Sequence, residues 1–135
     1  MVFDLNDETV DNFLACVTTV LRAAVDLTEP IFIRSLAELE QMESLDPFAQ
    51  APNDDIYERC VTFLPNASLT LPPLPIGSAR RAVEIFKVVG CEAYSITRMI
   101  GGNSGYAGAL IEKLTGVKVT TRNWNTIDRL LNKFI

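Results

Sequence analysis

The segment TTRNWNT, residues 120–126, concentrates polar side chains of the kinds that bind ligands. It holds three hydroxyls, a guanidinium and two amides, and an apolar periodicity typical of a helix follows it. Free backbone amides at a helix N-terminus attract anions, and an arginine adds charge and paired donors. The segment therefore predicts an anion or phosphate site. Its ligand-binding residues would be Thr121, Arg122, Asn123 and Asn125.

A purely structural interpretation of this segment stays open beside the first. Asn123 suits a helix N-cap, because its side-chain oxygen can accept from the amide of residue 125 or 126. Trp124 would then begin the apolar face of the last helix and anchor it in the core. That face is continued by Ile127, Leu130, Leu131 and Phe134.

A second candidate site is the glycine-rich loop before the preceding helix. Glycines let backbone amides approach a phosphate closely, and a following helix start adds partial positive charge. The loop is neither a P-loop nor a full dinucleotide fingerprint, and a flexible turn is the structural alternative. The candidate residues are Gly102, Asn103, Ser104 and Gly105, with Lys113 and Lys118 further along the chain.

The string IGGNSGYAGALIEKLTGVKV around this loop is similar to the core of an RNA-binding K-homology domain. Gly102 to Gly105 would form the Gly-x-x-Gly loop that clamps a nucleic-acid backbone, followed by a helix and Thr115-Gly116. Two features depart from that family, since the loop carries Asn103-Ser104 in place of a basic residue and a strand is predicted before it. The loop could still hold phosphate despite these departures. Nucleic-acid binding through this loop, Lys113, Lys118 and Arg122 is the alternative function.

The absence of histidine limits the chemistry available to this chain. It excludes Ser-His-Asp and Cys-His catalysis, and three distant cysteines cannot complete a four-ligand zinc site. We therefore expect no metal and no cofactor. Carboxylate chemistry stays open as a further alternative, although Asp54-Asp55 is more typical of a solvated turn.

Charge is distributed unevenly along the chain. Residues 1–75 carry three basic and thirteen acidic side chains, a net of −10, whereas residues 76–135 carry nine basic and four acidic ones, a net of +5. A basic half indicates an anionic partner, unless the two halves complement each other within the fold or across a dimer.

Hydrophobic periodicity and turn residues predict an alternation of helices and strands. A helix is expected over 6–25 and a short strand over 31–33. A capping box of Ser35 and Glu38 opens a second helix, which cannot pass Pro47. Later elements are a strand over 60–64, a hairpin of 82–89 and 93–100, a loop over 101–105, a helix over 106–115 ended by Gly116, an extended segment over 117–119, and a helix from about Asn123.

These elements predict one α+β domain spanning residues 1–135. The expected architecture is a ferredoxin-like sandwich, a mainly antiparallel sheet with helices packed on one face and an extra N-terminal helix. A helix over 82–89 is the alternative to the first hairpin arm. No apolar run reaches the ~20 residues of a membrane span and the N-terminus is acidic, so we expect a cytoplasmic protein.

Nearly the whole chain resembles the C-terminal half of a bacterial family, the domain of unknown function number sixteen ninety-seven. The resemblance rests on PIFIRS at 30–35, DPF at 46–48, VTFL at 61–64 and, most specifically, LIEKL at 110–114 with TTRNWNT. It implies a ferredoxin-like α+β half and no established activity. Because the other half would be missing, we expect a homodimer that covers the exposed surface. The predicted function is a non-catalytic interaction module that binds an anionic ligand or a protein partner through its basic C-terminal half.

Overall fold

The computed structural model describes residues 32, 34–49, 51–52, 56–66, 69–78, 82–100 and 103–134. The chain divides into two compact units, Met1–Ile33 and Arg34–Ile135. The helix predicted over 6–25 lies outside the described residues. Of the strand predicted over 31–33, Phe32 alone is described, and it has no regular secondary structure.

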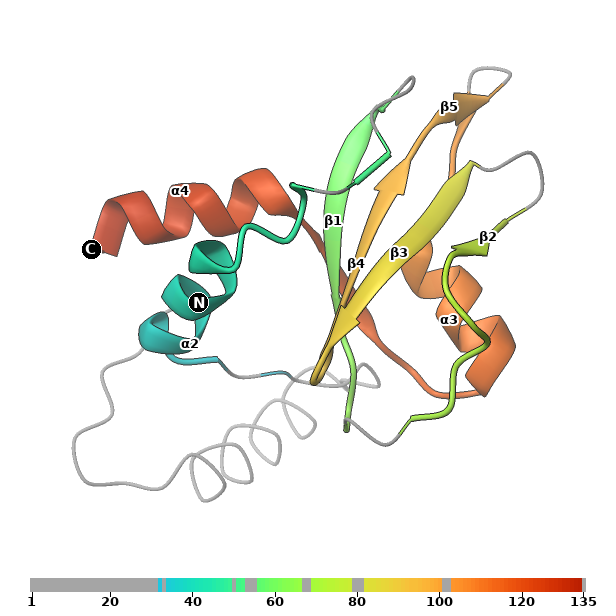
Figure 1. Cartoon of the computed structure of the whole chain (residues 1–135), viewed down its shortest axis with the longest axis horizontal. Coiled ribbons are helices and arrows are strands. Elements are labelled where there is room, and N and C mark those ends of the chain that lie inside the picture. Colours follow the sequence, from blue (N-terminus) through green and yellow to red (C-terminus); the bar gives the residue numbers. More distant parts are fainter. Residues whose placement is uncertain are drawn as a thin grey trace, which may run out of the picture. The chain divides into compact units, whose positions relative to one another are not determined.

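The second unit is an α+β fold built on a five-stranded antiparallel sheet (Figure 1). The strand order is β2-β3-β4-β1-β7, and a separate hairpin pairs β5 with β6. The strands are β1 (Glu58–Phe63), β2 (Ile76–Gly77), β3 (Val83–Val89), β4 (Glu92–Thr97), β5 (Met99–Ile100), β6 (Asn103–Ser104) and β7 (Thr120–Asn123). The helices are α2 (Leu36–Ser44), α3 (Ala107–Thr115) and α4 (Trp124–Phe134).

The three helices cover both faces of the sheet. Figure 1 shows α3 on one side of the strands and α2 with α4 on the other. The prediction of helices on one face is therefore wrong. The ferredoxin-like topology is not confirmed either, because the described order of elements is not β-α-β-β-α-β.

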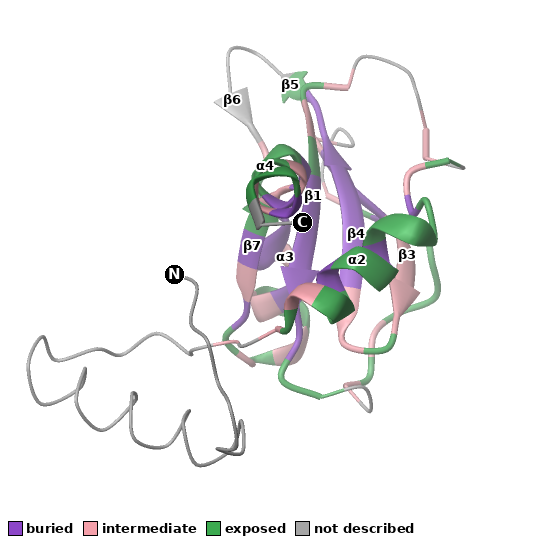
Figure 2. Ribbon diagram, turned by 90° about the vertical axis from the view of Figure 1, so that its left-hand side faces the viewer, coloured by how far each residue is buried: buried purple, intermediate pink, exposed green. Residues whose placement is uncertain are grey.

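The central strands are buried on both sides, which explains why helices are needed on each face. The side chains of β1 from Cys60 to Phe63 are all buried, as are those of β4 from Ala93 to Thr97 (Figure 2). Neighbouring residues of a strand point to opposite faces, so each strand contributes to two cores. Under α3 the buried apolar cluster comprises Leu64, Ile76, Val83, Ile85, Ala93, Ala107, Ile111 and Val119.

Four aromatic rings form the core of the opposite face. The Phe48 ring centroid lies 5.6 Å from that of Phe86, 5.8 Å from that of Tyr94 and 5.3 Å from that of Trp124. Tyr94 and Trp124 meet edge to face at 5.9 Å. Such tilted and edge-on pairs are the favoured geometries for aromatic contacts. Trp124 is 9% exposed, so the prediction that it anchors the last helix in the core is confirmed.

Local signals in the sequence locate several element ends. The Ser35 hydroxyl accepts from the Glu38 amide at 3.0 Å, which confirms the start of α2, and the helix ends at Ser44, before Pro47. Helix α3 ends at Gly116, whose left-handed φ of 71° favours glycine. The hairpin prediction is confirmed by β3 and β4, and the helical alternative for residues 82–89 is wrong.

Two predicted boundaries near the candidate sites are wrong. Residues 117–119, which we expected to be extended, do not form a strand. The strand is β7, which begins at the next residue, Thr120. The predicted loop over 101–105 contains β6, which pairs with β5 in register Met99↔Ser104 and Ile100↔Asn103. Both errors share a cause, because short polar strands such as TTRN and NS form by pairing with a partner strand rather than by their own apolar pattern.

We expect Trp124→Ala to lower the free energy of unfolding by about 3–5 kcal/mol, because it leaves a cavity among three other rings. Urea denaturation followed by far-ultraviolet circular dichroism measures this loss. Leu114→Ala is the control, since Leu114 is exposed on α3, and we expect a change of less than about 1 kcal/mol. A loss of similar size in both variants would contradict the anchoring role of Trp124.

Candidate functional site

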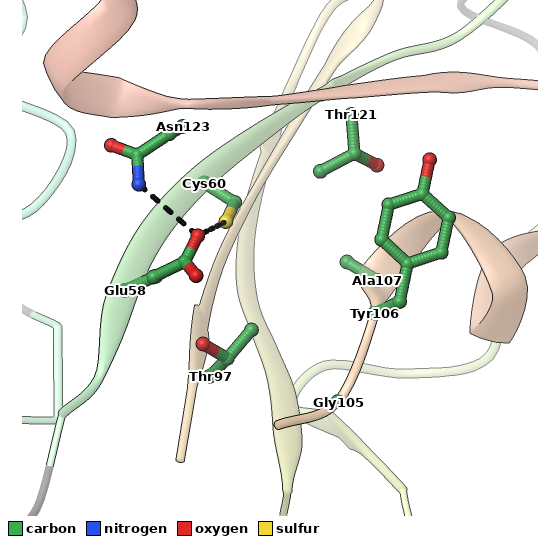
Figure 3. Close-up of a pocket in the computed structure, with 8 residues that line it drawn as sticks. All are labelled: Glu58, Cys60, Thr97, Gly105, Tyr106, Ala107, Thr121 and Asn123. Carbon is green, nitrogen blue, oxygen red and sulfur yellow. Dashed lines mark hydrogen bonds between the residues drawn. The ribbon is translucent and has the colours of Figure 1, made fainter. Parts of the chain in front are cut away.

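A pocket of about 270 Å³ opens on the α3 side of the sheet, at the end where β1 begins and β4 ends (Figure 3). Side chains from three neighbouring strands form one part of its wall, and the start of α3 forms another. The lining residues are Glu58, Cys60, Thr97, Gly105, Tyr106, Ala107, Thr121 and Asn123.

The strand register brings the polar lining residues together. Glu58 lies opposite Thr97 across the β1–β4 pair. Cys60 lies opposite Asn123 across the β1–β7 pair. Residues that oppose each other in an antiparallel pair point to the same face, and so do residues two apart in one strand. A single register therefore places these four side chains on the α3 face of the sheet.

Two glycines allow the start of α3 to approach the sheet closely. A Cβ atom at Gly105 would collide with a Val83 methyl group and lie 3.1 Å from the Ala82 backbone. A Cβ atom at Gly108 would lie 2.9 Å from the Tyr106 ring and 3.0 Å from the Thr121 hydroxyl. The glycines of this region therefore serve close packing around the pocket.

Hydrogen bonds hold two parts of the pocket wall in place. The Thr62 and Thr121 hydroxyls lie 2.7 Å apart and link β1 to β7 in the buried layer beneath α3. Asn123 uses both ends of its amide: its nitrogen donates to a Glu58 carboxylate oxygen at 3.1 Å, and its oxygen accepts from the Asn125 amide at 2.8 Å. The predicted capping role of Asn123 is thus confirmed, and the same side chain orients Glu58.

The thiol in this pocket is held in its protonated form. Burial, and secondly the negative charge of Glu58, raise the pKa of Cys60 to about 11. Its sulfur lies 4.0 Å from a Glu58 carboxylate oxygen, toward which it donates. Because the thiolate is the reactive form of cysteine, Cys60 is a poor nucleophile at neutral pH.

One buried hydroxyl in the pocket has no hydrogen-bond partner. Thr97 is 3% exposed, and its hydroxyl oxygen makes no hydrogen bond within the part of the chain that the structure describes. Figure 3 shows this oxygen pointing toward the side of the pocket where Glu58 lies. The Ser95 hydroxyl is also buried and unpartnered, two residues earlier in β4, but it does not line the pocket. Buried polar groups are nearly always hydrogen-bonded, so the Thr97 hydroxyl marks a position that a bound molecule would satisfy.

The structure brings together only some of the residues predicted from the sequence. Gly105, Thr121 and Asn123 line the pocket. Arg122 is exposed and lies opposite Val61 in the register, so it belongs to the other face of the sheet, where its guanidinium donates to the Thr121 carbonyl at 3.0 Å. Asn125 is exposed at the start of α4.

The remaining predicted residues lie outside the pocket wall or outside the described side chains. Lys113 is exposed in the last turn of α3, and Lys118 is exposed in the segment that follows. Gly102 lies outside the described residues, and Asn103 and Ser104 form β6. A β-hairpin thus occupies the place of the Gly-x-x-Gly loop that the K-homology domain has between helices.

Sequence reasoning missed Glu58, Cys60, Thr97 and Tyr106. Glu58, Cys60 and Thr97 belong to strands whose pairing was not predicted, and no motif connects them along the chain. One signal could have grouped two of them: side chains of a strand alternate between the two faces of the sheet, so Glu58 and Cys60 share one face of β1. Tyr106, at the N-cap position of α3 and 55% exposed, was placed only as the helix start.

A second pocket, of about 220 Å³, lies between α2 and the turn of the β3–β4 hairpin. One of the two carboxylates in its wall, that of Glu92, already accepts from the Arg34 guanidinium at 2.9 Å. The same guanidinium lies 4.9 Å from the centroid of the Phe63 ring. These contacts attach the start of the second unit to the sheet, so we assign this region a structural role.

The residues that the structure describes contain no cluster of metal-ligating side chains and no membrane-spanning helix. No group of three or more histidine, cysteine, aspartate or glutamate side chains there is arranged to hold a metal ion. None of the helices that the structure describes has the length and apolar character needed to cross a bilayer.

Comparisons with known proteins give no relative: no family model, no curated protein and no solved structure matches this chain. The resemblance to family sixteen ninety-seven therefore stays a prediction.

We expect the Thr62–Thr121 hydroxyl pair to behave as a coupled unit. Thr62→Val or Thr121→Val alone leaves a buried hydroxyl without its partner and should lower the free energy of unfolding by about 1–3 kcal/mol. The double variant removes both hydroxyls at constant shape and should be more stable than the sum of the single losses implies. Denaturant unfolding of the four proteins measures the coupling, and strictly additive losses would refute it.

Proposed function

We propose that this domain is a non-catalytic binding module whose small-molecule site is the pocket between β1, β4, β7 and the start of α3. The observation that carries the proposal is Thr97, a residue of the pocket wall that is 3% exposed and whose hydroxyl has no hydrogen-bond partner among the described residues. Leaving such a group unsatisfied is costly, and a ligand that bonds to it removes this cost on binding. The wall also has the mixture typical of ligand sites, a few converging polar groups among apolar ones.

The chemistry of the lining supports binding rather than catalysis. Among the eight residues that line the pocket, Glu58 is the only carboxylate, so a pair of carboxyl groups for acid–base work is not provided by this wall. Cys60 is the one thiol there, and its pKa of about 11 keeps it protonated at neutral pH. An enzyme with carboxylate chemistry is the less supported alternative.

The anionic ligand expected from the charge of residues 76–135 is poorly supported at this pocket. In the part of the chain that the structure describes, the lining carries the Glu58 carboxylate and neither lysine nor arginine. An anionic partner or a nucleic acid would instead contact basic residues outside the pocket wall, which are the exposed Lys113, Lys118 and Arg122. These residues come from α3, the segment after it, and the opposite face of β7, which argues for a broad contact rather than a pocket.

We also propose that this protein is cytoplasmic and that it is related to family sixteen ninety-seven. The family assignment, and with it a ferredoxin-like relationship, is supported by residues 110–126, which form α3, β7 and the start of α4. The cytoplasm is supported by Cys60 and Cys91, which are free thiols of the kind that reducing compartments preserve.

A thermal-shift screen of small polar compounds tests the binding proposal. The library should contain amines, carboxylic acids, zwitterions, polyols, nucleotides and inorganic phosphate. We expect at least one compound to raise the melting temperature of the wild type, and Thr97→Val to reduce that rise several-fold because it removes the unpartnered hydroxyl. Thr97→Val should itself fold with unchanged or higher stability, since the hydroxyl has no partner to lose.

Ser95→Ala is the matched control for this screen. It removes the other buried unpartnered hydroxyl of β4, outside the pocket wall, and should leave the ligand-induced shift unchanged. Absence of any shift across the library would refute the small-molecule site. Fluorescence anisotropy with RNA and DNA at about 50 and 200 mM salt then tests the alternative, with Arg122→Ala as the weakened variant.

We further propose that the domain is a homodimer. Large apolar side chains are exposed on several elements of the described structure, and burial against a second copy would remove them from water. They are Leu45, Tyr57, Leu74, Met99, Tyr106 and Leu114. Light scattering at micromolar concentrations should therefore give twice the chain mass of 14.9 kDa, and a monomer mass throughout that range would overturn the dimer.

A further inference from the structure

We infer that the pocket takes a small zwitterion, a molecule with an ammonium group at one end and a carboxylate at the other, which is the chemistry of a free amino acid. The inference rests on the proposed small-molecule site and adds the class of ligand. Three features of the wall carry it: a carboxylate on one side, a helix start on the other, and an unpartnered hydroxyl.

The carboxylate side calls for a positive group on the ligand. Among the described residues of the lining, Glu58 is the only one with a formal charge. The amide nitrogen of Asn123 donates to one of its oxygens at 3.1 Å, and a neutral amide does not cancel the charge. Hydrogen bonds from an ammonium group to a carboxylate are about twice as strong as neutral ones. A primary ammonium group beside Glu58 is therefore favoured over a neutral or negative group.

The opposite side calls for a negative group. Ala107 is the first residue of α3 and Tyr106 its N-cap; both line the pocket with the preceding Gly105, across from Glu58 and Asn123 in Figure 3. The N-cap residue Tyr106 makes no side-chain capping hydrogen bond. The first backbone amides of a helix have no intrahelical acceptor, and the helix dipole adds partial positive charge there. A carboxylate is the group that such a helix start binds.

The Thr97 hydroxyl provides the independent evidence for a ligand. It is buried, has no partner within the described part of the chain and points into the side of the pocket that holds Glu58. A hydroxyl both donates and accepts, so it can accept from an ammonium group that also reaches Glu58. The helix start alone would not establish a site, whereas the hydroxyl adds a polar group whose hydrogen bond is missing without a ligand.

The volume of the pocket limits the size of the zwitterion. At about 270 Å³ it falls just below the range of about 300–1,000 Å³ that holds drug-sized molecules. A single amino acid suits this space better than a peptide or a nucleotide. Tyr106, which is 55% exposed, adds an aromatic surface against which a small side chain can pack.

Isothermal titration calorimetry of the full chain with the twenty free amino acids tests the inference. For the tightest of them, the C-terminal amide removes the carboxylate and the N-acetyl derivative removes the ammonium group. We expect each derivative to bind about tenfold or more weakly than the parent, because each loses a charge-assisted contact. Glu58→Gln should lower the affinity for the parent amino acid by a similar factor and leave the affinity for the N-acetyl derivative nearly unchanged.

Two control variants separate this effect from general damage. The Glu58→Gln substitution keeps the size of the side chain and an oxygen that accepts from Asn123, so this variant should fold. Glu112→Gln removes one negative charge from α3, outside the pocket, and keeps an acceptor for the Val119 amide, 3.2 Å away. We expect it to leave the affinity unchanged. Thr97→Val should weaken binding several-fold, and Ser95→Ala should not.

The outcomes distinguish the ligand class from the site itself. If the N-acetyl derivative binds as well as its parent, or if Glu58→Gln changes nothing, the zwitterion is overturned. The same holds if no amino acid binds while other compounds of the thermal-shift library bind in a Thr97-dependent way; the small-molecule site then stands. If neither set of compounds binds, the proposed function fails together with the inference.

Discussion

Burial of β1 on both of its faces is the constraint on which the rest of this structure depends. The strand lies between β4 and β7, and its side chains from Cys60 to Phe63 are all buried. A strand with two buried faces requires a cover on each, so α3 packs on one side and α2 with α4 on the other. Because both covers depend on one strand, a slip of β1 by a single residue would exchange the two cores at once.

The two faces of the sheet differ in the side chains that pack on them. One face is closed by aromatic contacts among Phe48, Phe86, Tyr94 and Trp124, and its interior contains the Arg98–Glu84 ion pair at 3.7 Å. The other face has aliphatic side chains and hydroxyls, and the candidate pocket opens among them near the end of β4. The pocket lies where aliphatic packing under α3 gives way to Glu58, Thr97 and Thr121. The candidate site therefore lies at the margin of one core.

Elements with strong local signals could be predicted from the sequence. The Ser35 N-cap of α2, the left-handed end of α3 at Gly116 and the β3–β4 hairpin each depend on a few adjacent residues, and all three are confirmed. Topology could not be predicted in the same way. Strand β7 pairs with β1, some sixty residues earlier, and the TTRN sequence has no apolar alternation that would indicate a strand. The sequence analysis placed the helices on one face of the sheet. It did so because the alternate side chains of β1 were not assigned to two separate cores.

The candidate site shows the same limit. Gly105, Thr121 and Asn123 were found because a glycine loop and a helix cap are local patterns. Glu58 and Thr97 were missed because they become neighbours only through the β1–β4 register. The basic residues Lys113, Lys118 and Arg122 were grouped by their proximity in sequence, whereas the pleat of β7 separates Arg122 from the pocket.

Strand β7 passes into α4 without an intervening loop, since Asn123 ends the strand and Trp124 begins the helix. Asn123 touches the pocket carboxylate on one face of the sheet, and the next residue is a ring of the aromatic core on the other. Trp124 is also the only tryptophan in the chain. The molecule thus carries a native fluorophore one peptide bond from Asn123, a residue of the candidate site. A displacement of Asn123 on ligand binding would change the surroundings of that indole, so its emission spectrum would report occupancy of the pocket without a dye or an engineered probe.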